Sequence, residues 1–497
     1  MNTTPLTRRR LLQGAATLAV ASSLPGCGSS TNTTTSTPPV TTNQQPVPTG
    51  PLTQASLTVT ATTSGSIGPA FAGLSYEKSA LYEPLFTASN ANLIALFKRL
   101  GPSLLRVGGN SVDRNVWTPN GAGQTSGQIA PSDMNALAAF VKATGWQILY
   151  GINLGGSASG VQTPALAAAE VAYAAQQFGS SLLGIEIGNE CDLYGNSGNY
   201  YAGNWSLAQF ETLWAQYRTA ILATTPGVAI TGPADASNES GWTVPFGKFA
   251  TKSEITLLTQ HYYRANGQLA TSTVDYLVTP DTSLVSNLAT LKAGAQTIGI
   301  PYRMSECNSF YNGGSLNVSD AYASALWVID YLFNCAQGGA SGANFHGGGN
   351  STGYTPIADS NGVVQDARPE YYGMYFFTLA GTGNLLTTTL TAGGLNATAY
   401  AVKTSAGTSV VLVNKDSTQN LAVTAQLPST INSASLIAMT QGPGTPSLSA
   451  TTGVTIQGGT INADASYSPN TAYTISTSGT QLTCYVPALS AVLISIT

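Results

Sequence analysis

The strongest constraint on the fold is a regular alternation of two kinds of segment between residues 71 and 382. Eight short apolar stretches have the composition of buried strands, and segments with helical spacing separate many of them. The apolar stretches are 71–76, 104–108, 148–154, 182–187, 228–232, 255–262, 302–305 and 342–345. Because parallel strands need crossover helices that cover their faces, this alternation predicts an α/β fold, a (β/α)₈ TIM barrel, with an open doubly wound sheet as the alternative.

The helical segments carry apolar residues at a spacing of three and four. One of them starts at Ser206 and Gln209, which are placed to form an N-terminal capping box. Its apolar face consists of Leu207, Phe210, Trp214, Tyr217 and Ile221. The other predicted helices are 92–100, 133–143, 165–178, 284–298 and 321–336, and the aromatic run 371–377 is expected to fill the core face of the last barrel helix.

A second domain is expected after residue 383, where helical spacing gives way to short alternating strands. The clearest of these strands are 399–402, 410–413, 421–425 and 491–496. Alternation at period two with polar turns predicts an all-β sandwich over 383–497. An isolated strand within 55–70 is expected to join that sandwich, so the domain would use both ends of the chain. Residues 28–54 are polar and are expected to form a disordered linker.

The N-terminal 27 residues are typical of an export signal. The run Thr7-Arg8-Arg9-Arg10-Leu11-Leu12-Gln13 resembles a twin-arginine signal, and Leu24-Pro25-Gly26-Cys27 resembles a lipoprotein cleavage box. We therefore expect lipid attachment at Cys27, which would be the only link to a membrane. The expected location is periplasmic or on the outer surface as a lipoprotein, or secreted. The four remaining cysteines are expected to be free, because such substrates fold before they leave a reducing compartment.

Composition excludes some partners. Only 8% of the 497 residues are charged, and the 18 Lys and Arg residues do not cluster outside Arg8-Arg9-Arg10 of the predicted signal. Nucleic-acid binding requires a basic surface, so we expect no nucleic-acid partner.

Two glutamates lie at the predicted C-terminal ends of barrel strands. Glu190 follows the fourth apolar stretch, and Glu306 follows the seventh. The C-terminal strand ends of a TIM barrel form its active site, so these carboxylates could face each other. Two opposed carboxylates are the usual apparatus of glycoside hydrolysis, and a retaining enzyme holds them about 5–5.5 Å apart. Asn189, beside Glu190, could hydrogen-bond the sugar 2-hydroxyl.

Several runs around these glutamates resemble glycoside hydrolase family 79, the β-glucuronidase and heparanase family of clan A retaining glycosidases. They are Phe71-Ala72-Gly73-Leu74-Ser75-Tyr76-Glu77, Arg106-Val107-Gly108-Gly109-Asn110, His261-Tyr262-Tyr263, and Glu306 followed by Tyr311-Asn312-Gly313. The resemblance implies an exo-acting retaining β-glucuronidase with Glu190 as acid/base and Glu306 as nucleophile. It also implies that Tyr311, Gly313 and Tyr354 bind the glucuronate carboxylate, and that Glu77 and Asn110 contact sugar hydroxyls.

The remaining polar residues near the strand ends are given supporting roles. Glu186 should face the barrel interior, where a buried carboxylate needs a partner such as Arg106. His261 is expected to support the nucleophile region, and Tyr263 could position Glu306. We expect no metal, because no third ligand accompanies the two histidines in the sequence, and no cofactor.

Three other functions remain open on the sequence alone. An endo-acting heparanase-like hydrolase would need basic residues along its cleft, and an arabinofuranosidase or xylan-directed enzyme would share the barrel and its glutamates. The third is a carbohydrate-binding surface lipoprotein without catalysis. For the β-glucuronidase that the resemblance implies, the expected partner is a glycan or glycoside that contains glucuronic acid.

Overall fold

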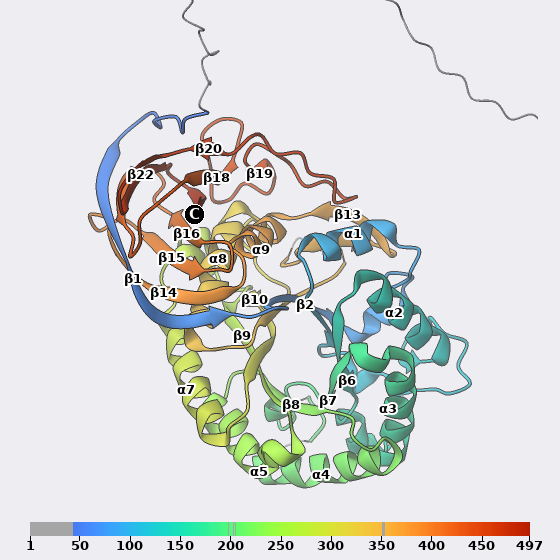
Figure 1. The fold of residues 1–497 in the computed structure, drawn as a ribbon. Helices are drawn as coiled ribbons and strands as arrows, with labels where there is room; N and C mark the ends of the chain where they lie inside the picture. The colour runs from blue at the N-terminus through green and yellow to red at the C-terminus, as the bar shows by residue number, and fades with distance from the viewer. Residues whose placement is uncertain (1–42, 197, 202, 204, 350–352) are drawn as a thin grey trace, which may run out of the picture. The chain divides into compact units, whose positions relative to one another are not determined.

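The computed structural model describes residues 43–196, 198–201, 203, 205–349 and 353–497, so the predicted signal and Cys27 lie outside the described residues. Its main feature is a closed barrel of eight parallel strands (Figure 1). In spatial order these are β2 (Ala72–Glu77), β3 (Leu104–Gly108), β6 (Gln147–Ile152), β7 (Leu182–Ile187), β8 (Ile230–Asp235), β9 (Leu257–Asn266), β10 (Tyr302–Tyr311) and β11 (Ala343–Gly347). The predicted TIM barrel is confirmed, and the open sheet is excluded.

Helices follow the barrel strands and cover the outside of the barrel (Figure 1). They are α1 (Ala91–Arg99), α2 (Pro131–Thr144), α3 (Pro164–Phe178), α4 (Leu207–Thr224), α5 (Val244–Glu254), α6 (Val274–Val278), α7 (Thr282–Ile298), α8 (Tyr322–Gly338) and α9 (Pro369–Leu379). Helix α4 begins as predicted, because the Ser206 hydroxyl accepts a hydrogen bond from the Gln209 N–H. Helix α5 has no counterpart in the sequence pattern, since Pro245, Gly247 and a kink at Thr251 weaken its helical signal.

The C-terminal region forms one sheet of eleven strands that curls around a second apolar core. Its strands are β1 (Leu52–Ile67), β14 (Gly383–Thr391), β15 (Ala397–Lys403), β16 (Thr408–Asn414), β17 (Asn420–Gln426), β18 (Ala434–Gln441), β19 (Val454–Ile456), β20 (Tyr473–Thr474), β21 (Ser476–Ser478), β22 (Gln481–Val486) and β23 (Ser490–Ile496). The expected two layers therefore belong to one continuous hydrogen-bonded sheet. Two small sheets, β4 (Val116–Trp117) with β5 (Gln128–Ile129) and β12 (Ile357–Ser360) with β13 (Val363–Ala367), lie in barrel loops.

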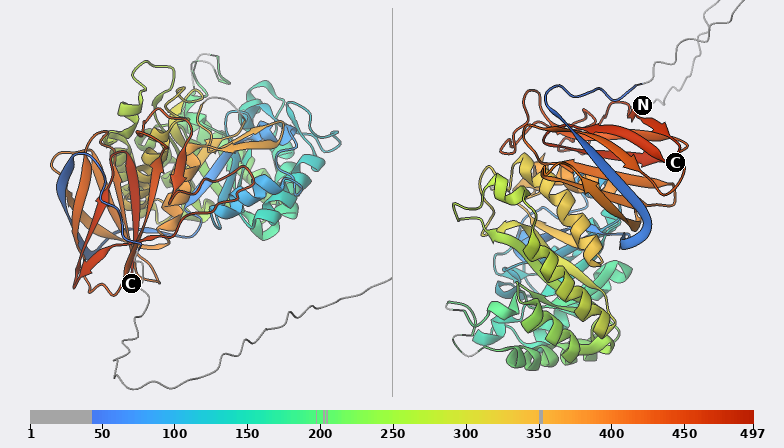
Figure 2. Two further views of the ribbon diagram at one scale, coloured as in Figure 1. Left: turned by 90° about the horizontal axis from the view of Figure 1, so that it is seen from above. Right: turned by 90° about the vertical axis from the view of Figure 1, so that its left-hand side faces the viewer.

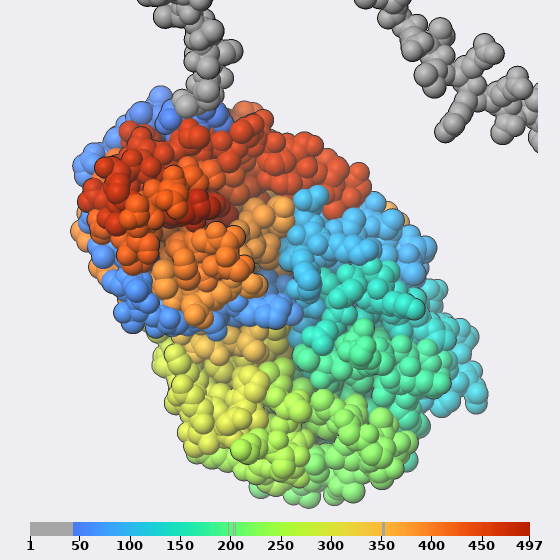
Figure 3. Space-filling model, viewed as in Figure 1, coloured from blue at the N-terminus to red at the C-terminus, as the bar shows by residue number. Residues whose placement is uncertain are grey.

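The N-terminal strand joins the C-terminal sheet, as the sequence predicted. Strand β1 pairs antiparallel with β14 and parallel with β17, so it connects the two halves of the sheet. Leu57 and Val59 point into the second core while Thr58 and Thr60 face solvent, which is the alternation expected of a strand covered on one face. Figures 2 and 3 show this blue segment against the orange and red strands of the sheet.

The described part of the expected linker, residues 43–54, contacts the C-terminal sheet. The Gln45 side chain donates to the Tyr485 carbonyl at 2.7 Å and accepts from the Tyr485 N–H at 2.9 Å, and β1 already begins at Leu52. Polar composition suggested disorder here, but amide side chains can replace the backbone partners that an edge strand lacks.

Helix α8 connects the barrel to the C-terminal sheet. The Tyr322 hydroxyl donates to the Leu489 carbonyl at 2.9 Å, and the rings of Phe333 and Tyr400 stack with centroids 4.2 Å apart. Lys415 and Asp330 form a salt bridge across the same boundary. Within the described residues, no helix is long and apolar enough to cross a membrane.

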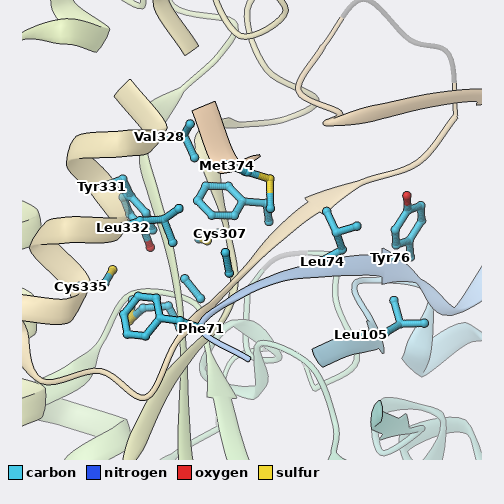
Figure 4. Close-up of a cluster of buried hydrophobic side chains, with 14 of the residues drawn as sticks. Phe71, Leu74, Tyr76, Leu105, Cys307, Val328, Tyr331, Leu332, Cys335 and Met374 are labelled. Atoms are coloured by element: carbon cyan, nitrogen blue, oxygen red, sulfur yellow. The ribbon is translucent and has the colours of Figure 1, made fainter. Parts of the chain in front are cut away.

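The inner face of α8 packs on the outside of the barrel. Figure 4 shows Tyr331, Leu332 and Cys335 of α8 with Met374 of α9 and Cys307 of β10 in this cluster. The four cysteines of the described residues are buried and free, as expected. Because Cys307 points toward α8, it faces away from the barrel interior.

Candidate active site

Glu190 and Glu306 both lie toward the C-terminal end of the barrel. Glu190 comes three residues after β7 and adopts a left-handed backbone conformation with φ of 49°. Its N–H donates to the Ala234 carbonyl at 2.8 Å. Glu306 lies within β10 at a point where the register against β9 shifts. A left-handed non-glycine residue persists only where its surroundings hold it, and such residues are concentrated at functional sites.

The two carboxylates lie close together. One oxygen of Glu190, one oxygen of Glu306 and one ring nitrogen of His261 are all within 4.8 Å of one another. The sequence placed these glutamates on separate strands of one barrel, and the structure brings them to a single point. This separation resembles the short spacing of retaining glycosidases rather than the wider spacing that inverting enzymes need for a water molecule.

Three side chains surround the Glu306 carboxylate. Arg106 Nη1 donates to Oε2 at 2.6 Å, the Tyr263 hydroxyl donates to Oε1 at 2.8 Å, and His346 Nδ1 lies 3.7 Å from Oε2. Burial alone would raise the pKa of Glu306, but the positive charges around it and the tyrosine hydrogen bond hold that pKa well below its usual range. Glu306 is therefore an ionised carboxylate with fixed orientation.

The surroundings of Glu190 are different. Its only described side-chain partner is His261, whose Nδ1 lies 3.0 Å from Oε1, and 17% of the Glu190 side chain is exposed. His261 is fully buried on β9. We expected His261 to support the nucleophile region, but its hydrogen bond is made to Glu190. The register explains the difference: His261 pairs with Glu306 along the backbone, and its side chain extends across to the neighbouring loop.

Arg106 is the centre of the polar network. It is completely buried on β3, and its Nε donates to Glu186 Oε2 at 2.6 Å, as the inward position of Glu186 predicted. Its Nη2 also donates to Asn189 Oδ1 at 2.8 Å, and its Nη1 to Glu306. The sequence reasoning missed these two contacts, although a buried arginine has five donors and one carboxylate occupies only part of them.

Glu77 and Asn110 contribute to the rim of the site. Glu77 Oε1 accepts from the Asn110 N–H at 3.1 Å, and Oε2 accepts from the N–H and hydroxyl of Ser111 at 2.7 and 2.5 Å. The Asn110 side chain accepts from Asn189 at 3.4 Å. These contacts fix the loop after β3 against the end of β2, which leaves fewer Glu77 lone pairs for a ligand than the resemblance implied.

His346 also belongs to the polar network, where a histidine at a strand end was expected to orient its neighbours by hydrogen bonds. It lies near the end of β11. Its Nδ1 forms a hydrogen bond of 3.1 Å with the Ser75 hydroxyl, and its Nε2 lies 3.6 Å from Glu77 Oε1. Burial by itself would lower the pKa of His346, but the carboxylates of Glu306 and Glu77 outweigh burial and raise it. A proton on His346 is thus stabilised by the two acidic groups that flank the ring.

The three residues expected to bind a substrate carboxylate lie in different surroundings. The Tyr354 ring lies 5.6 Å from the Tyr263 ring and 6.1 Å from the His346 ring, so it belongs to the site. Gly313 has φ of 83°, and a Cβ built there would meet nothing within 4 Å, so the space beside it is open. Tyr311 ends β10 with 45% of its surface exposed, at the outer rim.

Carboxylates and imidazole nitrogens are also metal ligands, and Glu190, His261 and Glu306 together offer three such groups. Both oxygens of Glu306 already accept from protein donors, and one of those donors is the guanidinium of Arg106. A permanent cation at 2.6 Å opposes a metal ion at the same oxygen. The donor set fits a reactive carboxylate better than a metal ligand.

Comparisons with known proteins agree with this architecture. No family model matches the chain. A β-glucuronidase of Aspergillus niger is 26% identical over 301 residues, which are 54% of this chain and 55% of that protein, so the match spans about half the length of this relative. A 4-O-α-L-rhamnosyl-β-D-glucuronidase from Fusarium oxysporum 12S has a similar structure, with a TM-score of 0.72 and 20% identity over 88% of this chain and 100% of its own.

Other enzymes share the fold. An α-L-arabinofuranosidase from Thermotoga maritima aligns with a TM-score of 0.65 and 14% identity over 89% of this chain and all of its own. The architecture is therefore that of glycosidases built from a TIM barrel and a β-domain.

Proposed function

We propose that this chain is an exo-acting retaining β-glucuronidase of glycoside hydrolase family 79. The observation that carries the proposal is the approach of the Glu190 and Glu306 carboxylates to within 4.8 Å at the C-terminal end of the barrel. The partial sequence match to a β-glucuronidase selects the sugar among the activities that this fold supports. The reaction would remove terminal β-linked glucuronic acid from a glycan or glycoside.

The environments of the two carboxylates suggest their roles. Glu306 is ionised and held between Arg106 and Tyr263, so it would attack the anomeric carbon and form a glycosyl–enzyme intermediate. Glu190 is more exposed and is paired only with His261, so it would give its proton to the departing oxygen. In the second step the ionised Glu190 would take a proton from the water that releases glucuronic acid.

Neutral donors would bind the carboxylate of the sugar. The Tyr311 and Tyr354 hydroxyls and the Gly313 N–H are proposed for this role, with Asn189 and Asn110 on the sugar hydroxyls. Such donors hold an anion without placing a cation beside the anomeric carbon, where positive charge develops in the transition state.

Hydrolysis of p-nitrophenyl β-glucuronide tests the proposal. We expect turnover by the native chain, loss of nearly all turnover in Glu306→Ala, and partial rescue of Glu190→Ala by azide with an activated aryl substrate. Glu83→Ala, at an exposed position, is the matched control for carboxylate loss and should keep the native rate. If Glu190→Ala keeps the native rate and azide changes nothing, the acid/base assignment is wrong.

The stereochemistry of the first product is a separate test of the nucleophile. Proton NMR of the early reaction should show β-glucuronic acid, because two displacements restore the original configuration. Initial release of the α-anomer would rule out Glu306 as a nucleophile even if the substrate assignment holds.

Parallel assays separate the alternatives. A heparanase-like enzyme would cut a glycosaminoglycan internally, and an arabinofuranosidase or xylan-directed enzyme would turn over the matching aryl glycosides. The Fusarium enzyme makes a 4-O-rhamnosylated glucuronide a necessary member of the substrate panel. No turnover of any of these substrates would favour the carbohydrate-binding lipoprotein.

We also propose that the chain is exported through its twin-arginine-like signal and anchored by lipid at Cys27. The proposal rests on residues 7–13 and 24–27 of the sequence. Mass spectrometry of the N-terminal peptide from the native and Cys27→Ala proteins tests it. An unmodified Cys27, or cleavage at another position, would contradict the lipid anchor.

A further inference from the structure

The end of the barrel opposite the glutamates contains a buried arginine that has no carboxylate partner among the described residues. Arg303 is the second residue of β10, only 3% of its surface is exposed, and its side chain lies inside the barrel. Its Nε donates to Asn344 Oδ1 at 2.6 Å, and its Nη atoms donate to the Ser341 and Phe71 carbonyls at 3.2 and 3.3 Å. All three acceptors are neutral.

The absence of a counter-charge is unusual for a buried guanidinium. Among the described residues, no carboxylate oxygen lies within 4.0 Å of Arg303, whereas Arg106 in the same barrel pairs with two carboxylates. Burial lowers the pKa of Arg303 to about 9, and the groups that act against burial are thiols. A buried charge without a partner is costly, so proteins pair such charges or bind a counter-ion to them.

The surrounding chain leaves room for this side chain. A Cβ on Gly342 would lie 2.1 Å from Arg303 Nη1, and a Cβ on Gly73 would lie 3.0 Å from Nη2. Any larger residue at Gly342 would displace the guanidinium. The position of the charge is therefore fixed by Gly73 of β2 and by Gly342, which precedes β11.

Arg303 also lines an open cavity at the N-terminal mouth of the barrel. Residues before or at the start of the barrel strands form its wall, among them Leu104, Gln147, Ala229, Leu257 and Ser341. Two of the five guanidinium N–H groups remain beyond those used by the three neutral acceptors. Donors in a planar fork match the geometry of a carboxylate or phosphate.

We propose that the N-terminal mouth of the barrel binds a small oxyanion, a carboxylate or a phosphate, which pairs with Arg303. The site lies at the opposite end of the barrel from Glu190 and Glu306 and does not depend on the proposed glucuronidase activity. The bound anion supplies the counter-charge that no carboxylate in the described part of the chain provides.

Thermal unfolding of the full chain tests the proposal. The melting temperature is measured against increasing sodium phosphate, sodium acetate and sodium chloride at constant ionic strength and pH. We expect phosphate or acetate to raise the melting temperature of the native protein by about 2 °C, with saturation, because a ligand that binds only the folded state stabilises it in this way. The anion that saturates at the lower concentration identifies the source.

Two variants decide whether Arg303 is responsible. Arg303→Gln keeps a donor for Asn344 but removes the charge, so its melting temperature should lose the saturable rise, while Arg303→Lys should retain part of it. A rise of equal size in the native protein and Arg303→Gln would overturn the proposal, since salts also stabilise proteins non-specifically. A rise that never saturates in the native protein would overturn it too.

A third variant serves if Arg303→Gln does not fold. Gln147→Glu introduces a carboxylate into the wall of the cavity at an exposed position. It should raise the melting temperature in the absence of phosphate or acetate and reduce the response to both. An undiminished response to these anions would contradict the site.

Discussion

Glu370 makes the stability of this protein depend on pH in a direction opposite to that of an ordinary carboxylate. It is fully buried at the start of α9, and its Oε2 accepts from Asn308 Nδ2 at 3.2 Å. Burial raises the pKa of Glu370 from its ordinary value of 4.5 to about 8. The folded protein therefore keeps a proton on Glu370 at neutral pH that the unfolded chain has released.

The sign and size of the effect follow from this difference. Stability from the protonated Glu370 is complete below pH 4.5, falls as pH rises between 4.5 and about 8, and is lost above that range. At about 1.36 kcal/mol per pH unit, the whole range corresponds to roughly 5 kcal/mol. Because Asn308 also donates to the His346 carbonyl at 2.9 Å, ionisation would disturb the strand that carries His346.

Glu370→Gln tests this reasoning, since glutamine keeps an acceptor for Asn308 and cannot ionise. Urea unfolding at pH 5, 6, 7 and 8 should show the variant gaining stability over the native protein with each step, to a few kcal/mol at pH 8. Glu370→Leu should show the same loss of pH dependence, but a lower free energy of unfolding than Glu370→Gln at every pH, because Asn308 loses an acceptor. Parallel curves for the native protein and Glu370→Gln would refute the raised pKa.

Two further predictions concern the candidate site. Tyr263→Phe removes the hydrogen bond that helps to lower the pKa of Glu306. We expect kcat/KM for p-nitrophenyl β-glucuronide to fall about 10–100-fold, and the acidic limb of its pH profile to move to higher pH. An unchanged pH profile of kcat/KM would argue against a positioning role for Tyr263. Gly314→Ala, at φ of 85°, places a Cβ 2.7 Å from the Tyr354 backbone nitrogen and should raise KM about tenfold. Gly145→Ala, at φ of 74° and with nothing within 4 Å of the new Cβ, is the control for backbone strain alone. Equal KM values in the two variants would exclude displacement of Tyr354.

The fold could be predicted because its signal is repeated along the chain. Eight apolar stretches at regular intervals leave few topologies, and each buried strand needs only its own apolar residues to be recognised. Strands β9 and β10 extend past their predicted ends at 262 and 305, because they continue to pair with each other up to Asn266 and Tyr311. That pairing involves polar residues and leaves no apolar pattern in the sequence.

The candidate site could be predicted only in part, for a related reason. The strand ends indicated Glu190 and Glu306, since position on the barrel decides which side chains meet. The partners of each carboxylate depend on reach and register instead. His261 hydrogen-bonds Glu190 although its backbone pairs with Glu306, and no spacing rule distinguishes these two outcomes.

The charge distribution of the site bears on which sugar it accepts. Glu77, Glu186, Glu190 and Glu306 converge on one fully charged partner, Arg106, and on two histidines. An incoming glucuronate adds another negative charge, and Coulomb repulsion in a buried site is strong. In the proposed reaction, the substrate carboxylate would therefore lie on the side of Tyr354 and Gly313. A neutral sugar meets no such restriction, so in the proposed glucuronidase the selectivity for glucuronate would come from the neutral donors on that side.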